Sequence, residues 1–228
     1  MSASMRLISS MATKQVLAEL LGQMPAQLLP VEVESVGGVD AAKRVQAGEA
    51  FDAVLLASGA IDKLIAGGHI VAGSRIDLFD SGIAMAVRAG APRPDIGSED
   101  AVKQAVLSAR TLGYSTGPSG VYLTSLFERW GIAQAIAPRI VQAPPGVPVG
   151  SLIASGEIEL GFQQLSELMH LPGITVLGPL PPAIQLITTF SGGVAIRSKQ
   201  PEAVRALLAY LASPATAAAK KRHGMESP

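Results

Sequence analysis

Short apolar runs alternate with longer amphipathic stretches along most of the chain. The short runs predict buried strands, and the helical spacing of apolar residues in the longer stretches predicts helices between them. In the first part of the chain, strands are expected at 6–9, 31–36 and 53–56, and helices at 13–21, 39–46 and 61–66. This order is typical of a mainly parallel sheet flanked by helices.

A second series of the same kind begins after Asp80. Because later strands return toward the first series, the sequence predicts an α/β fold of two lobes, residues 1–82 with 191–228 and residues 83–190, with a ligand cleft between them. The crossings are placed near 80–84 and 189–193. The expected strands are 83–87, 112–115, 140–142, 160–162, 175–177, 184–190 and 194–196, and the expected helices are 99–109, 121–130, 147–155, 201–211 and 215–223, with 166–169 continuing the alternation.

Composition and short motifs argue against several classes of partner and cofactor. The 18 basic and 18 acidic residues cancel, and neither sign gathers into a block, so no nucleic-acid partner is expected. The absence of cysteine removes disulfides and thiolate ligands, and the three scattered histidines argue against a zinc site, so no metal is expected. Neither a dinucleotide fingerprint nor a Walker loop is present, and no cofactor is expected.

The first thirteen residues carry one arginine and no long apolar core, so they do not resemble a signal peptide. No apolar run reaches the roughly 18 residues of a membrane span. We therefore expect a protein without a membrane span, cytoplasmic if the chain is full length and periplasmic if a signal peptide was removed.

Small hydroxyl residues and glycines follow several predicted strands. In open parallel sheets, ligands bind beyond the carboxyl ends of the strands, where helix N-terminal N–H groups point outward. Neutral N–H and O–H donors suit a dehydrated oxyanion or carboxylate, although the same residue types also serve as ordinary caps and turns. The expected ligand-binding residues of these turns are Ser9, Ser10, Gly37, Gly38, Ser58, Ser115, Thr116, Ser119 and Gly120.

Phe162, Gln163 and Gln164 follow a predicted strand of the second lobe, and the two amides either add donors to the site or begin a surface helix. Arg75 and Arg88 lie near the predicted crossing. A citrate-like polyanion would favour at least one guanidinium, whereas a tetrahedral oxyanion can be held by neutral donors alone. The alternative for both arginines is an exposed surface charge.

The segments QAGE at 46–49, FDAV at 51–54, IDKL at 61–64, GGHI at 67–70, GVYL at 120–123 and GEIELGF at 156–162 resemble those of molybdate-type solute-binding proteins. The resemblance covers nearly the whole chain. It implies the type II periplasmic-binding-protein fold and places Ser10, Gly37 or Gly38, Ser119, the Pro148 region and 162–163 around a bound oxyanion. The chain departs from that family at 37–38, where molybdate binders tend to carry a hydroxyl, and at 162–164, where they tend to carry a tyrosine.

The segments APRPDI at 91–96, GFQQLSE at 161–167 and GPLP at 178–181 resemble a divergent branch of the same fold, which is similar to bacterial aconitate isomerase. That resemblance implies a proton shift across an allylic system of a tricarboxylate without a cofactor. Such a shift needs a general base and donors that hold the carboxylate. Glu167 and His69 are the candidate bases, and the alternative for each is a solvated residue or a helix cap.

A rival interpretation comes from GYSTG at 113–117, which matches the nucleophile elbow of α/β-hydrolases, with Ser115 as nucleophile and His170 or His223 as base. Against it, Pro118 and Gly120 are expected to delay the helix, and no acid partner precedes the histidine. The sequence therefore predicts binding of a small anion or organic acid, with a transporter partner if the protein is exported. The alternatives are an aconitate-type isomerase and, third, a serine hydrolase.

Overall fold

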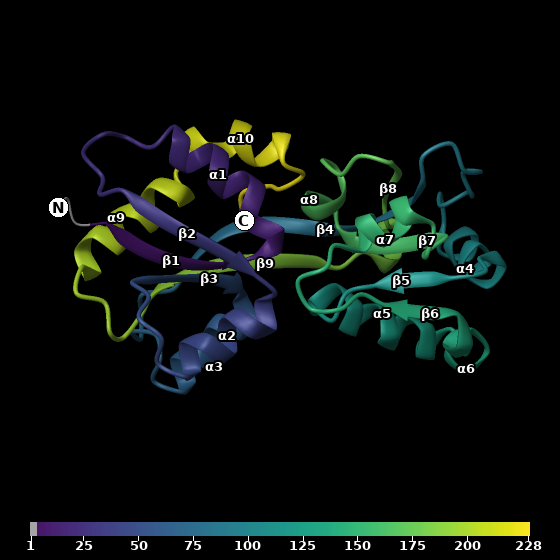
Figure 1. Ribbon diagram of the computed structural model, residues 1–228, viewed down its shortest axis with the longest axis horizontal. Coiled ribbons are helices and arrows are strands. Elements are labelled where there is room, and N and C mark those ends of the chain that lie inside the picture. Colours follow the sequence, from purple (N-terminus) through teal and green to yellow (C-terminus); the bar gives the residue numbers. More distant parts are fainter. Residues whose placement is uncertain (1–3) are drawn as a thin grey trace. The chain divides into compact units, whose positions relative to one another are not determined.

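The computed structural model describes residues 4–228, which form two compact units (Figure 1). Unit 1 contains the chain up to Ser81 and again from Thr188 to Pro228, and unit 2 contains Gly82–Ile187. The chain therefore crosses between the units at 81/82 and at 187/188. The lobes predicted from the sequence place these crossings one and three residues later, at 82/83 and 190/191.

In unit 1 the strands lie in the order β2, β1, β3, β9, β4. Strand β1 pairs in parallel with β2 and β3, and β9 runs antiparallel to β3. Because β1, β2 and β3 are parallel, their carboxyl ends meet at one edge of the sheet. The bounds are β1 Met5–Ser10, β2 Val31–Val36, β3 Ala53–Ala57, β4 Ile76–Arg88 and β9 Ile187–Val194.

Helices cover both faces of this sheet (Figure 1). Successive side chains of a strand point to opposite faces, so Leu7 packs in the core beneath α1, α9 and α10, and Ile8 packs beneath α2 and α3. Because apolar side chains on both faces of β1 are buried, helices are needed on both sides of the sheet. The bounds are α1 Lys14–Gly22, α2 Gly38–Gln46, α3 Ser58–Ala66, α9 Pro201–Ala212 and α10 Ala217–Arg222.

In unit 2 the strand order is β4, β7, β5, β6, and β8 pairs with β4. Strand β5 is parallel to β6 and β7, whereas β4 is antiparallel to β7 and β8. One core contains residues of α4 and α5, and the other contains residues of α7 and α8. The bounds are β5 Leu112–Tyr114, β6 Ile140–Gln142, β7 Leu160–Gln164, β8 Ile174–Pro179, α4 Glu99–Ser108, α5 Pro118–Arg129, α6 Ala133–Ile136, α7 Val149–Ser155 and α8 Leu165–Leu168.

The expected two-lobed α/β class is confirmed, but the two strands that connect the units differ from the expectation. Strand β4 is continuous from residue 76, although the sequence predicts a strand only from 83, because Asp77 and Asp80 interrupt its apolar pattern. Strand β9 replaces two expected strands. Its glycine pair hides the continuity, and a Cβ at Gly192 would lie 2.4 Å from Leu208 of α9, so close helix packing requires glycine there.

Helix α5 begins at Pro118, so the expectation that Pro118 and Gly120 delay this helix is wrong. Proline is compatible with the first turn because no N–H is needed there. Gly120 is required for a different reason, since an added Cβ would lie 1.8 Å from the carbonyl oxygen of Ser115. The short helix α6 is not predicted from the sequence.

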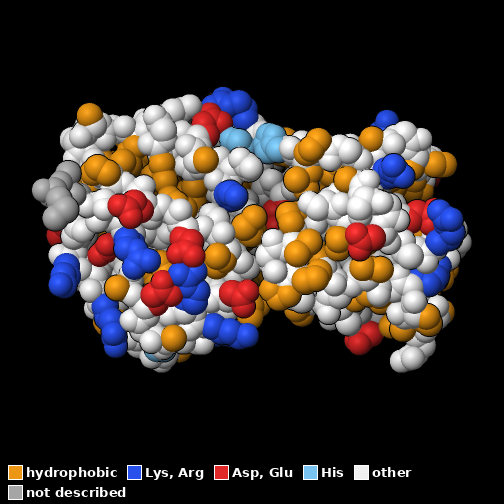
Figure 2. Space-filling view, viewed as in Figure 1, with side chains coloured by type: hydrophobic (Ala, Val, Ile, Leu, Met, Phe, Trp, Pro, Cys, Tyr) orange, Lys and Arg blue, Asp and Glu red, His pale blue; other side chains and the backbone are white. Residues whose placement is uncertain are grey.

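Basic and acidic side chains are interspersed on the face of the molecule drawn in Figure 2. In unit 1, Arg44 of α2 forms ion pairs with Glu34 at 2.5 Å and Glu49 at 2.6 Å. The positive charge of that surface is therefore neutralised locally. Across residues 4–228, no helix has the length and apolar character that crossing a bilayer requires.

Candidate functional site

The parallel strands of unit 1 run almost directly into helices at one edge of the sheet. Ser10 is followed by a 3-10 turn and α1, Gly37 precedes α2, and Ser58 is the first residue of α3. Because β1 lies between β2 and β3, the three turns are neighbours. The unpaired N–H groups of helix N-termini point toward such an edge. We call this set of turns the unit 1 edge.

Ser10 lies at the middle of the unit 1 edge. Its side chain is 7% exposed, and its hydroxyl oxygen has no hydrogen-bond partner in the described part of the chain. A Cβ added to Gly38 would lie 3.8 Å from the Cβ of Ser10, so α2 begins directly against this serine. A buried polar group without a partner costs about 1–3 kcal/mol and requires an explanation. The fold supplies none for Ser10.

The neighbouring hydroxyls of the unit 1 edge are already engaged. Ser9 Oγ lies 2.8 Å from Ser35 Oγ, and Ser58 Oγ donates a hydrogen bond to the Thr189 carbonyl at 2.8 Å. Their side chains therefore tie strand to strand and helix to strand. Of the residues predicted in unit 1, Ser10 and the main chain at Gly37 and Gly38 keep the donors that a ligand would need.

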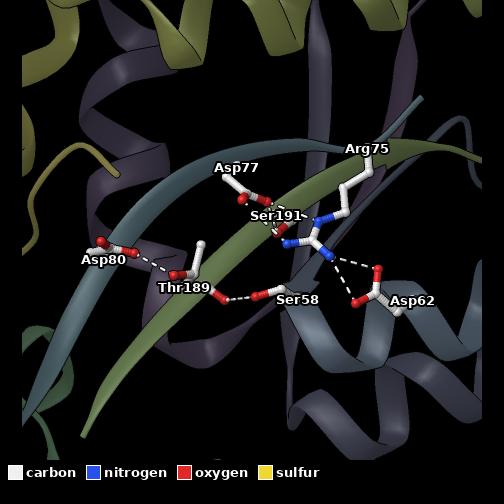
Figure 3. A network of polar contacts seen from close by, with 7 residues as sticks. All are labelled: Ser58, Asp62, Arg75, Asp77, Asp80, Thr189 and Ser191. Carbon is white, nitrogen blue, oxygen red and sulfur yellow. Dashed lines mark hydrogen bonds and ion pairs between the residues drawn. The ribbon is translucent and has the colours of Figure 1, made fainter. Parts of the chain in front are cut away.

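Arg75 belongs to a polar network of unit 1 that also contains Ser58 (Figure 3). Its guanidinium pairs with Asp62 at 2.6 Å and with Asp77 at 2.9 Å, and Arg75 lowers the pKa of the Asp77 carboxyl through their hydrogen bond. Two carboxylates thus already surround the guanidinium. Arg88 is the exposed last residue of β4. Arg75 is therefore not a free counter-charge for a polyanion, and Arg88 fits the alternative of an exposed surface charge.

In unit 2, β5 and β7 are parallel, with Tyr114 opposite Phe162. The turn after β5 therefore lies beside the residues after β7. Ser115 Oγ accepts a hydrogen bond of 3.4 Å from the Gly117 N–H, Thr116 is exposed, and Ser119 is 2% exposed in the first turn of α5. Residues 115–120 and 163–167 together form what we call the unit 2 edge.

The three residues predicted at 162–164 have different environments. Phe162 is fully buried and packs edge-on against Phe127, with ring centroids 6.2 Å apart, so its ring belongs to the core and not to a ligand surface. Gln163 is 2% exposed, accepts a hydrogen bond from the Val149 N–H at 2.9 Å, and donates one to Glu167 Oε1 at 2.8 Å. Gln164 is buried at the end of β7.

Glu167 is the candidate base with the unusual environment. Desolvation by burial raises the pKa of its carboxyl from 4.5 to about 7, and the hydrogen bond from Gln163 opposes this rise. The adjacent Ser166 is 3% exposed, and its hydroxyl has no partner in the described part of the chain. Sequence reasoning missed Ser166, although a hydroxyl residue just after the end of β7 is the same signal that selects the other turns.

His69 lies elsewhere. It follows the C-terminal end of α3, opposite the end that carries Ser58, and lines a shallow pocket of about 200 Å³ with Gly48 and Arg197. His223, a candidate base for the hydrolase, interacts with Glu19 Oε2 of unit 1 at 2.7 Å, whereas Ser115 belongs to unit 2. Within residues 4–228, no cluster of three or more His, Asp or Glu side chains could hold a metal ion.

The fold and the strand-to-helix turns define a solute-binding protein of the type II periplasmic-binding-protein fold. The chain matches the family model described as bacterial extracellular solute-binding protein over residues 5–226, and it belongs to that family. An aconitate isomerase from a Pseudomonas species is 45% identical over 184 residues, which cover 80% of this chain and 70% of that protein.

Solved structures of low identity share the fold. The periplasmic molybdate-binding protein of Azotobacter vinelandii aligns with a TM-score of 0.81 and 19% identity, covering 98% of this chain and 99% of that one. The sulfate-binding protein SubI from Mycobacterium tuberculosis H37Rv aligns with a TM-score of 0.78 and 15% identity, covering 98% and 86%. These comparisons confirm the resemblance to molybdate-type binders and to aconitate isomerase that the sequence motifs indicate.

Proposed function

We propose that the protein binds a small organic acid with several carboxylates, and that neutral hydroxyl and main-chain N–H donors hold at least one of them. The observation that carries this proposal is the buried hydroxyl of Ser10, which lacks a protein partner at the start of α2. A carboxylate oxygen would accept hydrogen bonds from the Ser10 hydroxyl and from the N–H groups at the start of the neighbouring helix α2. Neutral donors hold such a group without a buried counter-charge.

The choice of a polycarboxylate over a tetrahedral oxyanion rests on the relatives. The 45% identical protein is named for aconitate, a tricarboxylate, whereas the molybdate- and sulfate-binding structures are 19% and 15% identical. The two edges each offer donors suited to one carboxylate: Ser10 with Gly38 in unit 1, and Ser119 with the α5 N-terminus in unit 2.

A thermal-shift series tests the proposal with cis-aconitate, trans-aconitate, citrate, molybdate, sulfate and phosphate. A tricarboxylate at about 100 times its Kd adds about 2.7 kcal/mol to the free energy of unfolding, which raises the Tm by about 5–10 °C for a chain of this size. The inorganic oxyanions are expected to give smaller shifts. A tricarboxylate that leaves the Tm unchanged while an inorganic oxyanion raises it would overturn the polycarboxylate assignment.

Ser10→Ala tests the carrying observation directly. Since the Ser10 hydroxyl has no protein partner, its removal is expected to leave the Tm of the ligand-free protein unchanged or slightly higher, while the ligand-induced shift becomes smaller. Ser119→Ala is expected to reduce the shift as well. Ser125→Ala is the matched control, because Ser125 is an exposed residue of α5 whose hydroxyl bonds only to the Val121 carbonyl of its own helix. Equal ligand shifts in all three variants would contradict the site.

A second candidate function is cofactor-independent isomerisation of the bound tricarboxylate. It is favoured by the 45% identity to an aconitate isomerase over most of the chain. Incubating protein with cis-aconitate and following trans-aconitate by NMR separates the roles, because a binding protein leaves its ligand unchanged. In the binding role, an exported form of the protein would act outside the cytoplasm and deliver its ligand to a membrane transporter.

A further inference from the structure

The elements against which Glu167 chiefly packs carry no other ionisable side chain. Helix α8 packs chiefly against β7, α7 and β8. The sequences of these elements are LGFQQ, VGSLIAS and ITVLGP, so within these fully described segments Glu167 is the one ionisable side chain. The nearest ionisable residue along the chain is His170, which is exposed beyond the end of α8. An acid placed in this way is not part of a stabilising ion pair.

The same carboxyl is held in place by a buried amide. Gln163 accepts a hydrogen bond from the Val149 N–H at 2.9 Å, which fixes the orientation of its side chain and points its amino group at Glu167 Oε1, 2.8 Å away. The neighbouring Ser166 hydroxyl is buried without a partner. A fixed amide, an unpaired hydroxyl and a single carboxyl are thus gathered where β7 ends, beside the turn after β5.

We propose that Glu167 carries the proton in an allylic shift on an unsaturated polycarboxylate bound at the unit 2 edge, with Gln163 as its positioning residue. This proposal rests on the proposed function, since the polycarboxylate must first bind. A pKa of about 7 supports it, because a base works best when its pKa is near the working pH. A carboxylate with a raised pKa is a stronger base toward a carbon acid than an ordinary carboxylate.

The step conserves atoms and electrons. The Glu167 carboxylate takes a proton from the methylene carbon next to the double bond, and the electron pair left behind forms a new carbon–carbon double bond. The old double bond opens toward the carboxylate at its far end, where hydroxyl and N–H donors stabilise the negative charge. Protonated Glu167 then returns the proton to the far carbon. No oxidant, reductant or cofactor takes part.

Exchange of the substrate methylene protons with solvent deuterium tests this role. Wild-type protein in D2O is expected to introduce deuterium into cis-aconitate and to form trans-aconitate, with a rate that rises with pH toward a plateau above about pH 7. Glu167→Gln is expected to slow both processes about 100-fold or more while keeping affinity for aconitate by calorimetry. Glu157→Gln is the matched control, because it removes an exposed acid of the same unit whose side chain contacts Ser155.

The role of Gln163 has its own signature. Because its hydrogen bond favours the charged form of Glu167, Gln163→Met is expected to move the rising limb of the pH–rate profile to higher pH. A purely structural role would lower the rate equally at every pH. Unchanged deuterium exchange in Glu167→Gln, or aconitate binding without exchange in the wild type, would overturn the role of Glu167. Wild-type protein that does not bind aconitate would instead overturn the proposed function.

Discussion

The carboxylate of Asp80 accepts a hydrogen bond of 2.6 Å from the Thr189 hydroxyl, which fastens β4 to β9 where both strands belong to unit 1 (Figure 3). Asp80 is held a second time, because its main-chain N–H and carbonyl each pair with Glu226 at 2.9 Å. The chain passes into unit 2 directly after Ser81 and returns at Thr188. The side-chain bond therefore joins two residues of unit 1 that lie next to the two crossings, Asp80 just before the first and Thr189 just after the second.

Thr189→Val is expected to lower the free energy of unfolding by about 1–2 kcal/mol, because valine keeps the shape of threonine but the half-buried Asp80 carboxylate loses its donor. Thr189→Ser keeps the hydroxyl and is the control. Urea unfolding followed by circular dichroism measures both variants. Equal midpoints for Val and Ser would show that this hydrogen bond adds nothing to stability.

The turn after β5 depends on one particular glycine. An added Cβ at Gly120 would lie 1.8 Å from the Ser115 carbonyl oxygen, whereas at Gly117 the first contact is Ser115 Oγ at 3.5 Å. Gly120→Ala is therefore expected to lower the free energy of unfolding by about 2–3 kcal/mol or more and to weaken ligand binding, because the first turn of α5 must move. Gly117→Ala is expected to lower the free energy of unfolding by about 1 kcal/mol or less, because an N-cap favours glycine over alanine but the added Cβ has room. Chemical denaturation of the two variants tests the contrast, and similar losses would contradict it.

Glu167 is expected to make folding stability depend on pH near neutrality. Its folded pKa of about 7 lies above the ordinary 4.5, so the folded protein holds a proton that the unfolded chain releases between these values. The stability contributed by the protonated group is complete below pH 4.5 and is lost as the pH rises through 7, by up to about 3 kcal/mol. Comparing unfolding at pH 5 and pH 8 measures the effect. Glu167→Gln should remove most of the difference, and an unchanged difference would assign it to other groups.

The sequence predicts most elements and the neighbouring turns of unit 1, because parallel strands place their carboxyl ends together whatever their exact bounds. It does not predict which hydroxyls remain free. Ser58 bonds to Thr189, 131 positions away in the chain, and no local pattern contains that pairing.

The buried strands set a second limit on what the sequence can predict. Every residue of β7 is buried, so alternation gives no sign that Phe162 faces the core. Gln163 and Glu167 are only four positions apart, but Gln163 belongs to β7 and Glu167 to α8, so the side-chain spacing rule for helices does not predict their hydrogen bond.

Lys220 places a buried charge inside unit 1, and its effect on the free energy of unfolding can be measured. Its side chain is fully buried, its Nζ donates to Ser227 Oγ at 3.2 Å, and it lies 5.2 Å from the centre of the Phe79 ring. Burial lowers the pKa of this amine, which means that burying the protonated form costs free energy.

Lys220→Met keeps the length of the side chain and removes the cost of burying the charge, so the free energy of unfolding is expected to stay the same or rise by about 1 kcal/mol. Lys220→Ala, which leaves a cavity against Phe79, is expected to lose about 2 kcal/mol or more. Urea denaturation of both variants decides the matter: a large loss in Lys220→Met would mean that the contacts with Phe79 and Ser227 outweigh the cost of burying the charge.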